Sequence, residues 1–233
     1  MVSPFSTLSL VTAILVATLS LSSTIVALPD FPKIMPFQQY NTAADIPKEM
    51  FKKHSILYGR VEKVIDGDTF RVRHYPFYPL GFRSKYDGKL SENTMSVRIY
   101  GVDAPEVAKF GNPSMPKAEE ATEWAKDKID GKIVRIKLLR RDQYKRAVAK
   151  VTTRGFLPFT KADMSIGLAE KGYGILYTGG GAEYDGKREL LEKKIERAQR
   201  KKKGIWENGT NILTPAEYKK DIKNNKSKAP KSK

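Results

Sequence analysis

The stretch that decides the fold is residues 95–131, MSVRIYGVDAPEVAKFGNPSMPKAEEATEWAKDKIDG, which joins a predicted strand to a predicted helix. In Met95–Val102 apolar and polar side chains alternate with the period of two that a half-buried strand requires. The helix is predicted by apolar residues at helical spacing, namely Ala118, Ala121, Ala125 and Ile129. Pro116 stands near its start, and Asp130-Gly131 ends it.

Four further strands and two further helices surround this stretch. The strands are predicted at Ser55–Ile65, Thr69–Arg73, Ile133–Leu139 and Ala147–Thr153. A short helix opens at Met164–Leu168 and stops at Gly172, and a last helix spans Lys187–Lys202. Five strands with a helix between the third and the fourth predict an α+β fold, mainly a closed five-stranded Greek-key barrel of the oligonucleotide-binding (OB) type, with about three helices.

The composition limits the function. The chain has 233 residues, with 43 Lys and Arg against 26 Asp and Glu, and a formal charge of +17. With no Cys it can form no disulfide, iron–sulfur cluster, thiolate zinc site or cysteine nucleophile. Two His leave little room for a histidine metal cage or a His-dependent triad. The basic excess favours a polyanionic partner, either nucleic acid or an acidic membrane surface.

The N-terminus carries no charged side chain before Asp30. Residues 7–28 are all Ala, Val, Ile, Leu, Ser or Thr, which as a helix is long enough to cross a hydrocarbon core of about 30 Å. Residues 1–28 are therefore predicted to be a transmembrane anchor or a cleaved signal peptide. Ile25-Val26-Ala27 would serve as a cleavage site, whereas the absence of a preceding Lys or Arg and the basic residues that follow favour an anchor.

Two flanking segments are predicted to lie outside the folded domain, which is then residues 55–207. Residues 29–54 are rich in Pro and polar side chains and are predicted to be a linker. Residues 208–233 are predicted to be a basic disordered tail, because residues 216–233 hold seven Lys, two acids and almost no apolar side chain. Within the domain, His74–Asn93 is too irregular for one element and long for a loop.

Acidic residues follow two of the predicted strands. The segment 64–70, VIDGDTF, places Asp66 and Asp68 on either side of a glycine between two strands. Taken alone, it is best interpreted as a hairpin turn, because Asp-Gly is among the commonest hairpin sequences.

The second acidic segment is 97–106, VRIYGVDAPE, in which Asp103 and Glu106 bracket a turn stiffened by Pro105. Pro105 also biases Ala104 toward an extended backbone, so that its carbonyl can be held rigidly next to the Asp103 carboxylate. Hard cations such as Ca²⁺ prefer such oxygens. The alternative is a strand that ends in an ordinary Asp-X-Pro turn, but this leaves Arg98 on the strand unexplained.

A third segment, 140–146, RRDQYKR, joins the last two predicted strands with four basic residues around an acid and a tyrosine. A charge run of this kind is most often a solvated hairpin loop. Its position opposite the acidic segments in a small barrel gives it a possible role at the same site.

Together, these segments resemble the staphylococcal nuclease (thermonuclease) family. The matching patterns are I-D-G-D-T at 65–69, R-x-x-G-V-D-A-P-E at 98–106, D-Q-Y-K-R at 142–146 and G-I-W at 204–206. They stand at consistent spacing between about Ser55 and Trp206. Phe110-Gly111 and residues 181–184 look more like the membrane-anchored branch of eukaryotes, which commonly has one N-terminal transmembrane segment and is often assigned to mitochondria.

The resemblance implies a calcium-dependent endonuclease that hydrolyses phosphodiester bonds of DNA, RNA or both. Asp68 and Asp103 would bind Ca²⁺ through their carboxylates, and Ala104 through its backbone carbonyl. Glu106 would hold and activate the attacking water. This agrees with the general need of phosphodiester cleavage for a cationic clamp and an in-line water.

The resemblance also implies a set of substrate contacts. Arg98 and Arg146 would clamp the phosphate in the transition state, a bidentate task that suits guanidinium better than ammonium. Tyr144 would contact the substrate, and Arg140 and Arg141 are candidates for following its backbone.

Three departures from the family pattern affect the substrate contacts, and one of them is the insertion at His74–Asn93, which would narrow or widen the groove. Lys145 replaces the glycine usual between Tyr144 and Arg146, which affects where Arg146 is placed. The pair of tyrosines that stacks on the nucleotide in bacterial members has no clear counterpart, although Tyr173, Tyr177 and Tyr184 lie in the corresponding region.

Three functions compete at this point. The first is a membrane-tethered or exported nuclease, which is expected to be monomeric and to favour single strands, because their bases are free to stack on aromatic side chains. The second is a catalytically inactive OB-fold protein that binds nucleic acid, and the third a basic adaptor at a membrane surface. The first is favoured because all five side chains that the chemistry needs are present. Its location is then a single-pass membrane, mitochondrial by resemblance, or the secretory pathway if residues 7–27 are a cleaved signal.

Overall fold

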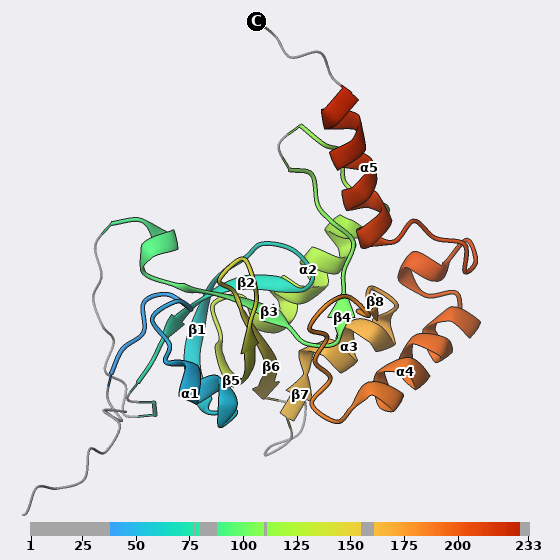
Figure 1. Cartoon of the computed structure of the whole chain (residues 1–233). Coiled ribbons are helices and arrows are strands. Elements are labelled where there is room, and N and C mark those ends of the chain that lie inside the picture. Colours follow the sequence, from blue (N-terminus) through green and yellow to red (C-terminus); the bar gives the residue numbers. More distant parts are fainter. Residues whose placement is uncertain (1–37, 77, 80–87, 110, 155–160, 229–233) are drawn as a thin grey trace, which may run out of the picture. The chain divides into compact units, whose positions relative to one another are not determined.

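The computed structural model describes residues 38–76, 78–79, 88–109, 111–154 and 161–228 (Figure 1). All of them belong to one compact unit, residues 36–233. The predicted anchor or signal at 1–28 lies outside the described residues, as do residues 77 and 80–87 of the irregular segment His74–Asn93. No helix among the described residues is both long enough and apolar enough to cross a membrane.

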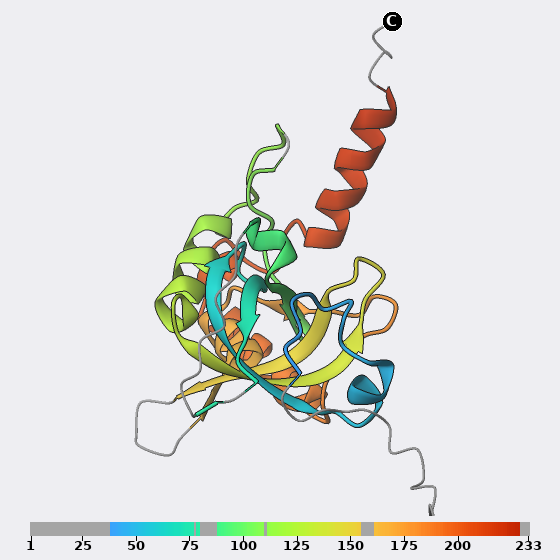
Figure 2. The same cartoon turned by 90° about the vertical axis from the view of Figure 1, so that its left-hand side faces the viewer.

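Five strands form a closed barrel, which confirms the predicted architecture. They are β1 (Ile56–Val64), β2 (Thr69–His74), β3 (Met95–Ile99), β5 (Ile133–Arg141) and β6 (Ala147–Arg154). The sheet order is β3-β2-β1-β5-β6-β7, with β7 (Lys161–Asp163) at the edge, and an additional parallel pairing of β3 with β6 closes the barrel (Figure 2). A small second sheet pairs β4 (Val102–Asp103) with β8 (Ile175–Leu176).

The barrel forms because its strands alternate apolar and polar residues. Inward-facing side chains with no solvent exposure come from every strand: Val61, Val72, Val97, Ile136 and Val151. Gly59 lies where β1 approaches β2 closely, because a Cβ at this position would lie 2.5 Å from the carbonyl oxygen of Arg73. Glycine is therefore required for this curvature of the strand.

Five α-helices accompany the barrel in the described part of the chain, where about three are predicted. They are α1 (Lys48–Lys52), α2 (Ala118–Ile129), α3 (Met164–Lys171), α4 (Arg188–Arg200) and α5 (Pro215–Lys228), with short 3₁₀ turns η1 (Leu90–Glu92) and η2 (Gly204–Trp206). The predicted alanine and isoleucine face of α2 is fully buried. The Asp163 carboxylate caps α3, and Gly172, at φ +82°, ends it.

Three expectations differ from the structure. The strand predicted at Met95–Val102 is broken at Gly101 into β3 and β4. The predicted linker at 29–54 contains core residues, since Tyr40, Ile46 and Phe51 are buried, so the domain begins well before residue 55. The predicted disordered tail at 208–233 contains helix α5.

Candidate active site

The turn between β3 and β4 brings Arg98 and Asp103 together. Gly101, at φ +70°, has the left-handed backbone that reverses the chain here, and a Cβ would lie 2.7 Å from Cδ1 of Leu191. Asp103 therefore returns alongside the strand that carries Arg98, and Arg98 Nη2 donates to Asp103 Oδ1. The two side chains are only 11% and 6% exposed. This is a buried, charge-assisted pair.

Asp68 reaches the same guanidinium from the β1–β2 hairpin. Its Oδ2 lies 3.4 Å from Arg98 Nη2 and accepts a hydrogen bond from the Ala104 amide at 3.3 Å. Its Oδ1 accepts the Thr69 hydroxyl at 2.7 Å. The β2–β3 register pairs Thr69 directly with Arg98, which explains why residues 30 positions apart in sequence meet here. The structure thus brings the predicted Asp68, Arg98, Asp103 and Ala104 into one place.

A third aspartate, Asp66, adds to this cluster, although the sequence supports only a turn role for it. Its Oδ1 accepts the Asp68 amide at 3.3 Å, and its Oδ2 accepts from Lys109 Nζ at 3.0 Å. Burial and the neighbouring Asp68 raise the pKa of Asp66 to about 7, against the lowering effect of Lys109. Asp66 therefore holds a proton far more readily than an ordinary aspartate.

The surroundings separate the pKa values of the other two aspartates. Burial opposes ionisation of Asp68, but the charge of Arg98 and the Thr69 hydroxyl hold its pKa below the ordinary value. Burial and the charge of Asp68 raise the pKa of Asp103 to about 6, despite the nearby Lys219 and Arg98. One arginine is therefore shared between two buried carboxylates, and additional positive charge would stabilise both in the ionised form.

Glu106 lies beside this cluster and is held by two lysines. Its Oε1 is 2.8 Å from Lys219 Nζ of α5, and its Oε2 is 3.9 Å from Lys109 Nζ. Its side chain is 19% exposed, so solvent reaches it. The predicted water-activating carboxylate is thus present next to Asp103, but its negative charge is neutralised within the chain.

Strand register places Arg98 and Arg140 on one face of the barrel. Arg98 of β3 and Arg140 of β5 both pair with Val148 of β6, and paired residues project to the same face of a sheet. Arg98 and Arg140 also line one small pocket together with Tyr177 and Glu183. Two predicted phosphate or backbone contacts are thus neighbours in space.

Arg146 lies just before β6, two residues from Val148, so the same alternation points it to the face of Arg98. Its Nε donates to Asp142 Oδ2 at 2.6 Å, and its guanidinium lies 5.3 Å from the ring centroid of Tyr144. The Tyr144 side chain projects into solvent, with 70% of its surface exposed. Lys145 adopts φ +59°, the left-handed conformation that favours glycine. The turn thus keeps a glycine-type backbone although the glycine is replaced.

Arg141 has a different position from the other predicted arginines. It pairs with Ala147, one residue out of phase with Arg140, and therefore projects to the opposite face. Its Nη2 donates to the carbonyl oxygen of Ile46, and its guanidinium lies 5.2 Å from the ring centroid of Phe51. The structure therefore gives Arg141 a role in holding the N-terminal segment on the barrel, apart from the acidic cluster.

Tyr177 is the aromatic residue that the structure adds to the site. The Arg98 guanidinium lies 4.6 Å from its ring centroid, and the Tyr184 hydroxyl donates to its carbonyl at 2.6 Å. The amide of Tyr177 donates to the carbonyl of Gly101 at 3.0 Å, which ties this segment to the β3–β4 turn. Sequence spacing alone did not single out Tyr177 among its neighbours.

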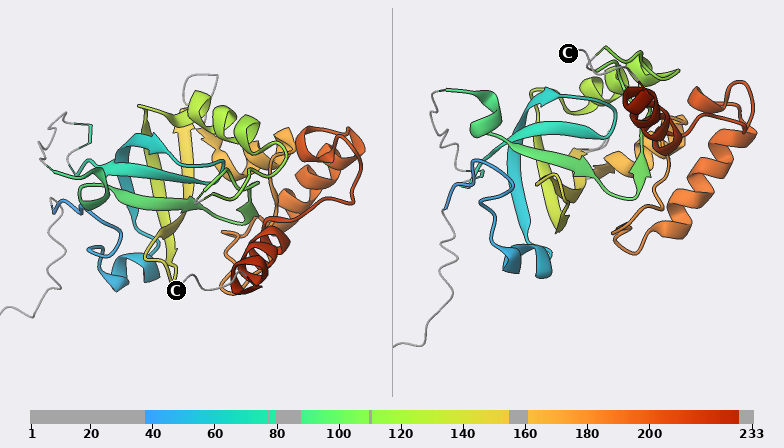
Figure 3. Two further views of the ribbon diagram at one scale, coloured as in Figure 1. Left: turned by 90° about the horizontal axis from the view of Figure 1, so that it is seen from above. Right: turned by 45° about the horizontal axis from the view of Figure 1, so that its top comes forward.

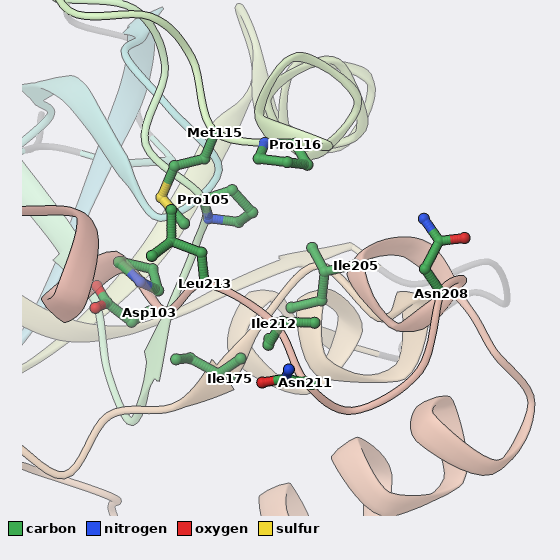
Figure 4. Close-up of a pocket in the computed structure, with 11 residues that line it drawn as sticks. Asp103, Pro105, Met115, Pro116, Ile175, Ile205, Asn208, Asn211, Ile212 and Leu213 are labelled. Atoms are coloured by element: carbon green, nitrogen blue, oxygen red, sulfur yellow. The ribbon is translucent and has the colours of Figure 1, made fainter.

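An apolar pocket adjoins Asp103 on the side of the C-terminal segment (Figure 4). Pro105, Met115 and Leu213 lie close together near the Asp103 carboxylate, and Ile175, Ile205 and Ile212 continue the wall. Asn208 and Asn211 supply polar groups at its edge. The pocket therefore lies between residues 103–106, which we call the acidic turn, and the segment that leads to α5.

Two lysines of the site, Lys109 and Lys219, were not predicted from the sequence. Lys109 follows Glu106 by three residues, a spacing that could have indicated an ion pair. Lys219 lies in a lysine-rich segment where no pattern distinguishes it from its neighbours. Only the position of α5 shows that it reaches Glu106.

The donor set fits a hard cation that keeps several waters. Among the described residues, no group of three or more His, Cys, Asp or Glu side chains is placed so that it could hold a metal ion by itself. The carboxylates of Asp68 and Asp103 and the adjoining backbone of Ala104 provide hard oxygen atoms, and the shared Arg98 leaves the pair short of positive charge. Such a partial oxygen shell is compatible with Ca²⁺, whose coordination is flexible and includes water.

The barrel and its clustered acids and arginines define a protein of the staphylococcal nuclease type. A family model described as "Staphylococcal nuclease homologue" matches residues 96–208. "Endonuclease Htp3" of Saprolegnia parasitica is 41% identical over 184 residues, which are 79% of this chain and 85% of that protein. The chain belongs to the staphylococcal nuclease family, as the sequence motifs predict.

Two fungal relatives show similar coverage, and both are named "Probable endonuclease LCL3". The protein of Yarrowia lipolytica is 37% identical over 198 residues, covering 79% of this chain and 84% of its own length. That of Komagataella phaffii is 39% identical over 196 residues, covering 79% of this chain and 83% of its own. The similarity therefore extends over most of both chains, well beyond the individual motifs.

Proposed function

We propose that this protein is a calcium-dependent endonuclease that hydrolyses phosphodiester bonds in DNA, RNA or both. The observation that carries the proposal is the buried Arg98 shared by Asp68 and Asp103, with Glu106 beside them. Membership of a family whose relatives are named endonucleases supports the same reaction.

In this proposal Asp68, Asp103 and the Ala104 carbonyl hold Ca²⁺. The bound cation supplies positive charge that polarises the phosphate and stabilises the negative charge of the transition state. Burial of the two carboxylates keeps competing water away and strengthens their electrostatic interactions. Arg98, which contacts both carboxylates, is positioned at the same time to donate to a phosphate oxygen.

Glu106 is the residue best placed to accept a proton from the attacking water. Its side chain is partly exposed, and the rigid Pro105 fixes the backbone just before it. General-base assistance of this kind contributes about 10²- to 10⁴-fold in rate. The lysines that now pair with Glu106 must move away from it for this role.

The face that carries Arg98, Arg140 and Arg146 would bind the phosphate backbone. Exposed Tyr144 and the ring of Tyr177 next to Arg98 offer surfaces on which bases can stack. Stacking requires unpaired bases, so we expect single strands to be cleaved faster than duplexes. The protein is proposed to act as a monomer, because one chain contributes every group of this site.

We further propose that residues 7–28 tether the protein to a membrane, as a single-pass anchor, with the mitochondrion as the expected compartment. The uncharged, apolar composition of the segment supports this proposal. Mass spectrometry of the mature N-terminus tests it. An intact segment supports the anchor, whereas a chain that starts near Leu28 would instead indicate export through the secretory pathway.

The central experiment compares wild type with Glu106→Gln, using the full-length protein. The substrates are circular single-stranded DNA, circular duplex DNA and RNA, each in Ca²⁺ or in chelator. We expect wild type to cut circular single strands in Ca²⁺ only, and Glu106→Gln to lower the rate about 10²- to 10⁴-fold while binding is kept. Glu123→Gln is the matched control, because Glu123 is an exposed residue of α2 paired with Lys126.

The competing function is a nucleic-acid-binding barrel without catalysis. It would be indicated by a wild-type protein that binds DNA and RNA yet cuts neither in Ca²⁺, and behaves no differently from Glu106→Gln. Cleavage that is unaffected by chelator would remove the calcium part of the proposal while leaving the nuclease.

A further inference from the structure

Helix α5 is attached to the acidic turn through two consecutive side chains. Lys219 Nζ lies 2.8 Å from Glu106 Oε1, and the Tyr218 hydroxyl donates to the carbonyl of Pro113 in the same loop. Figures 1 and 2 both show α5 rising beside the loop that follows β4. The view from above places the helix over the side of the domain where that loop emerges (Figure 3). The helix thus delivers a lysine directly to the proposed water-activating carboxylate.

The Lys219 ammonium faces more than Glu106. Burial favours its neutral form, but the charges of Asp103, Glu106 and Asp68 raise its pKa above the ordinary value, so it is a cation at neutral pH. Arg98 is the cation in direct contact with Asp103, and Lys219 reaches this cluster through its ion pair with Glu106. The carboxylate proposed to activate water is therefore already paired with a positive charge from this chain.

The rest of α5 is poorly anchored to the domain. Between Ala216 and Asn224 every side chain is exposed or only partly buried. The helix instead begins with its own capping box, in which Glu217 Oε2 accepts the Thr214 amide at 2.9 Å and Thr214 Oγ1 accepts the Glu217 amide at 3.2 Å. Pro215, the first residue of α5, is buried and lines the apolar pocket beside Asp103. Residues 216–224 can therefore leave the turn without exposing a hydrophobic core, provided that Pro215 stays in place.

We propose that α5 is an autoinhibitory element, in which Lys219 occupies the acidic site as an internal cation and competes with the metal ion for it. The proposal rests on the calcium-dependent site proposed above. Lys219 pairs with Glu106 while α5 is docked, so this carboxylate is not free to accept a proton. Ca²⁺ bound at the same carboxylates would repel the ammonium and so release the helix. A half-exposed lysine forms a weak ion pair, so the inhibition is graded and reversible.

The test measures Ca²⁺ affinity by isothermal titration calorimetry on the full-length protein. Lys219→Met keeps the length and apolar stem of the side chain and removes its charge. We expect it to bind Ca²⁺ about three- to tenfold more tightly than wild type. Lys220→Met is the matched control, because it makes the same charge change one residue further along the same helix, at an exposed position; its affinity should equal that of wild type.

Hydrogen exchange gives a second readout that does not depend on catalysis. In wild type, Ca²⁺ together with a non-cleavable oligonucleotide should speed amide exchange in residues 215–224, as the helix is released. Equal Ca²⁺ affinities for Lys219→Met and Lys220→Met, or an α5 that stays equally protected, would overturn the autoinhibitory role. Ca²⁺ binding that persists unchanged in Asp103→Asn would instead overturn the proposed metal site on which the inference rests.

Discussion

Arg98 is the residue on which the proposed chemistry depends most. It contacts Asp68 and Asp103 and lies against the ring of Tyr177, so three parts of the chain meet at one guanidinium. A lysine has the same charge but only one nitrogen, and it has no planar face with which to stack. The geometry of the site therefore demands arginine rather than any cation.

We accordingly expect Arg98→Lys to lower kcat about 10²- to 10³-fold, as for other groups that stabilise developing charge. The unfolding midpoint should stay close to that of wild type, because a buried positive charge is kept between the two carboxylates. Steady-state kinetics and thermal unfolding measure the two effects separately. Arg135→Lys is the control, because it makes the same change on a different strand, β5. An unchanged kcat for Arg98→Lys would exclude Arg98 from the reaction.

His74 is a second residue whose environment has a measurable consequence. Its ring is buried, accepts the Tyr40 amide at Nδ1 at 3.1 Å, and stacks on the Tyr40 ring. Burial lowers its pKa from 6.5 to about 4. Between about pH 6.5 and pH 4, His74 is therefore protonated in the unfolded chain but neutral in the folded protein. The stability of the folded protein falls as the pH falls through this window.

We expect His74→Asn, which keeps a hydrogen-bond acceptor but does not titrate, to remove this dependence. Between pH 7 and pH 5, the free energy of unfolding should fall about 2 kcal/mol more for wild type than for the variant. Urea unfolding at the two pH values measures the difference, and other titrating groups cancel because both proteins contain them. Parallel pH profiles would show that His74 is protonated equally well in both states.

At the residue scale the sequence predicted the parts of the site that belong to motifs. Asp68, Arg98, Asp103, Ala104 and Glu106 are predicted because they match the motifs of the family that the sequence resembles, and the structure places them close together. Residues supplied by distant, patternless segments could not be identified in the same way. Lys219 and Tyr177 reach the site through tertiary packing, which short-range periodicity does not record.

At the scale of elements, a β-bulge decides which arginine faces the site. The register between β5 and β6 shifts between Leu138 and Arg140, and both Leu138 and Leu139 are buried. This extra residue changes the alternation of the strand, so that Arg140 shares the face of Arg98 while Arg141 projects toward Phe51. The existence of the strand could be predicted from its apolar residues, but the bulge depends on packing against β6.

The curvature of β1 provides a prediction at the same scale. We expect Gly59→Ala to destabilise the protein by about 2–4 kcal/mol, because its Cβ would collide with Val72 and with the backbone of Arg73. Gly180→Ala is the matched control, since a Cβ there meets nothing within 4 Å. Chemical unfolding compares the two. Equal stabilities would mean that β1 and β2 can separate at little cost.

At the scale of the whole molecule, the folded domain begins earlier than its motifs indicate. Tyr40, Ala43, Ile46, Met50 and Phe51 are buried in the hydrophobic core. Residues 29–54 appear linker-like in composition because the apolar residues are scattered among prolines and polar side chains. Their burial depends on a surface that the barrel provides, and Arg141 helps to hold them there.

A chain that begins at Ser55 should therefore be much less stable than one that begins at Pro36. Each large apolar side chain lost from the core costs about 1.5–3 kcal/mol. The loss of Tyr40, Ile46, Met50 and Phe51 together is therefore comparable to the whole stability of an ordinary domain. Circular dichroism during thermal unfolding compares the two proteins. If both unfold at the same temperature, the segment 38–54 contributes little to the core.

The order of the five strands and the helix between the third and fourth could be predicted for the whole molecule, because each strand has its own period of two. The helical state of residues 215–228 could not, since their lysine-rich composition is also that of a disordered chain. The helix is stabilised by a capping box at Thr214 and Glu217 and by contacts to Pro113 and Glu106, which a disordered chain does not make. None of these contacts leaves a hydrophobic pattern in the sequence.

The parallel pairing of β3 with β6 has a consequence for how this protein is made. It joins residues 97–99 to residues 147–149, and Arg98 lies within that seam. A nascent chain on the ribosome cannot complete the barrel until β6 has left the exit tunnel, and long-range pairing of this kind forms late during folding. The Arg98–Arg140 face is therefore assembled only after most of the domain has been synthesised. Fragments that end before residue 147 would carry the acidic motifs without a working site, so a truncated message gives an inert product.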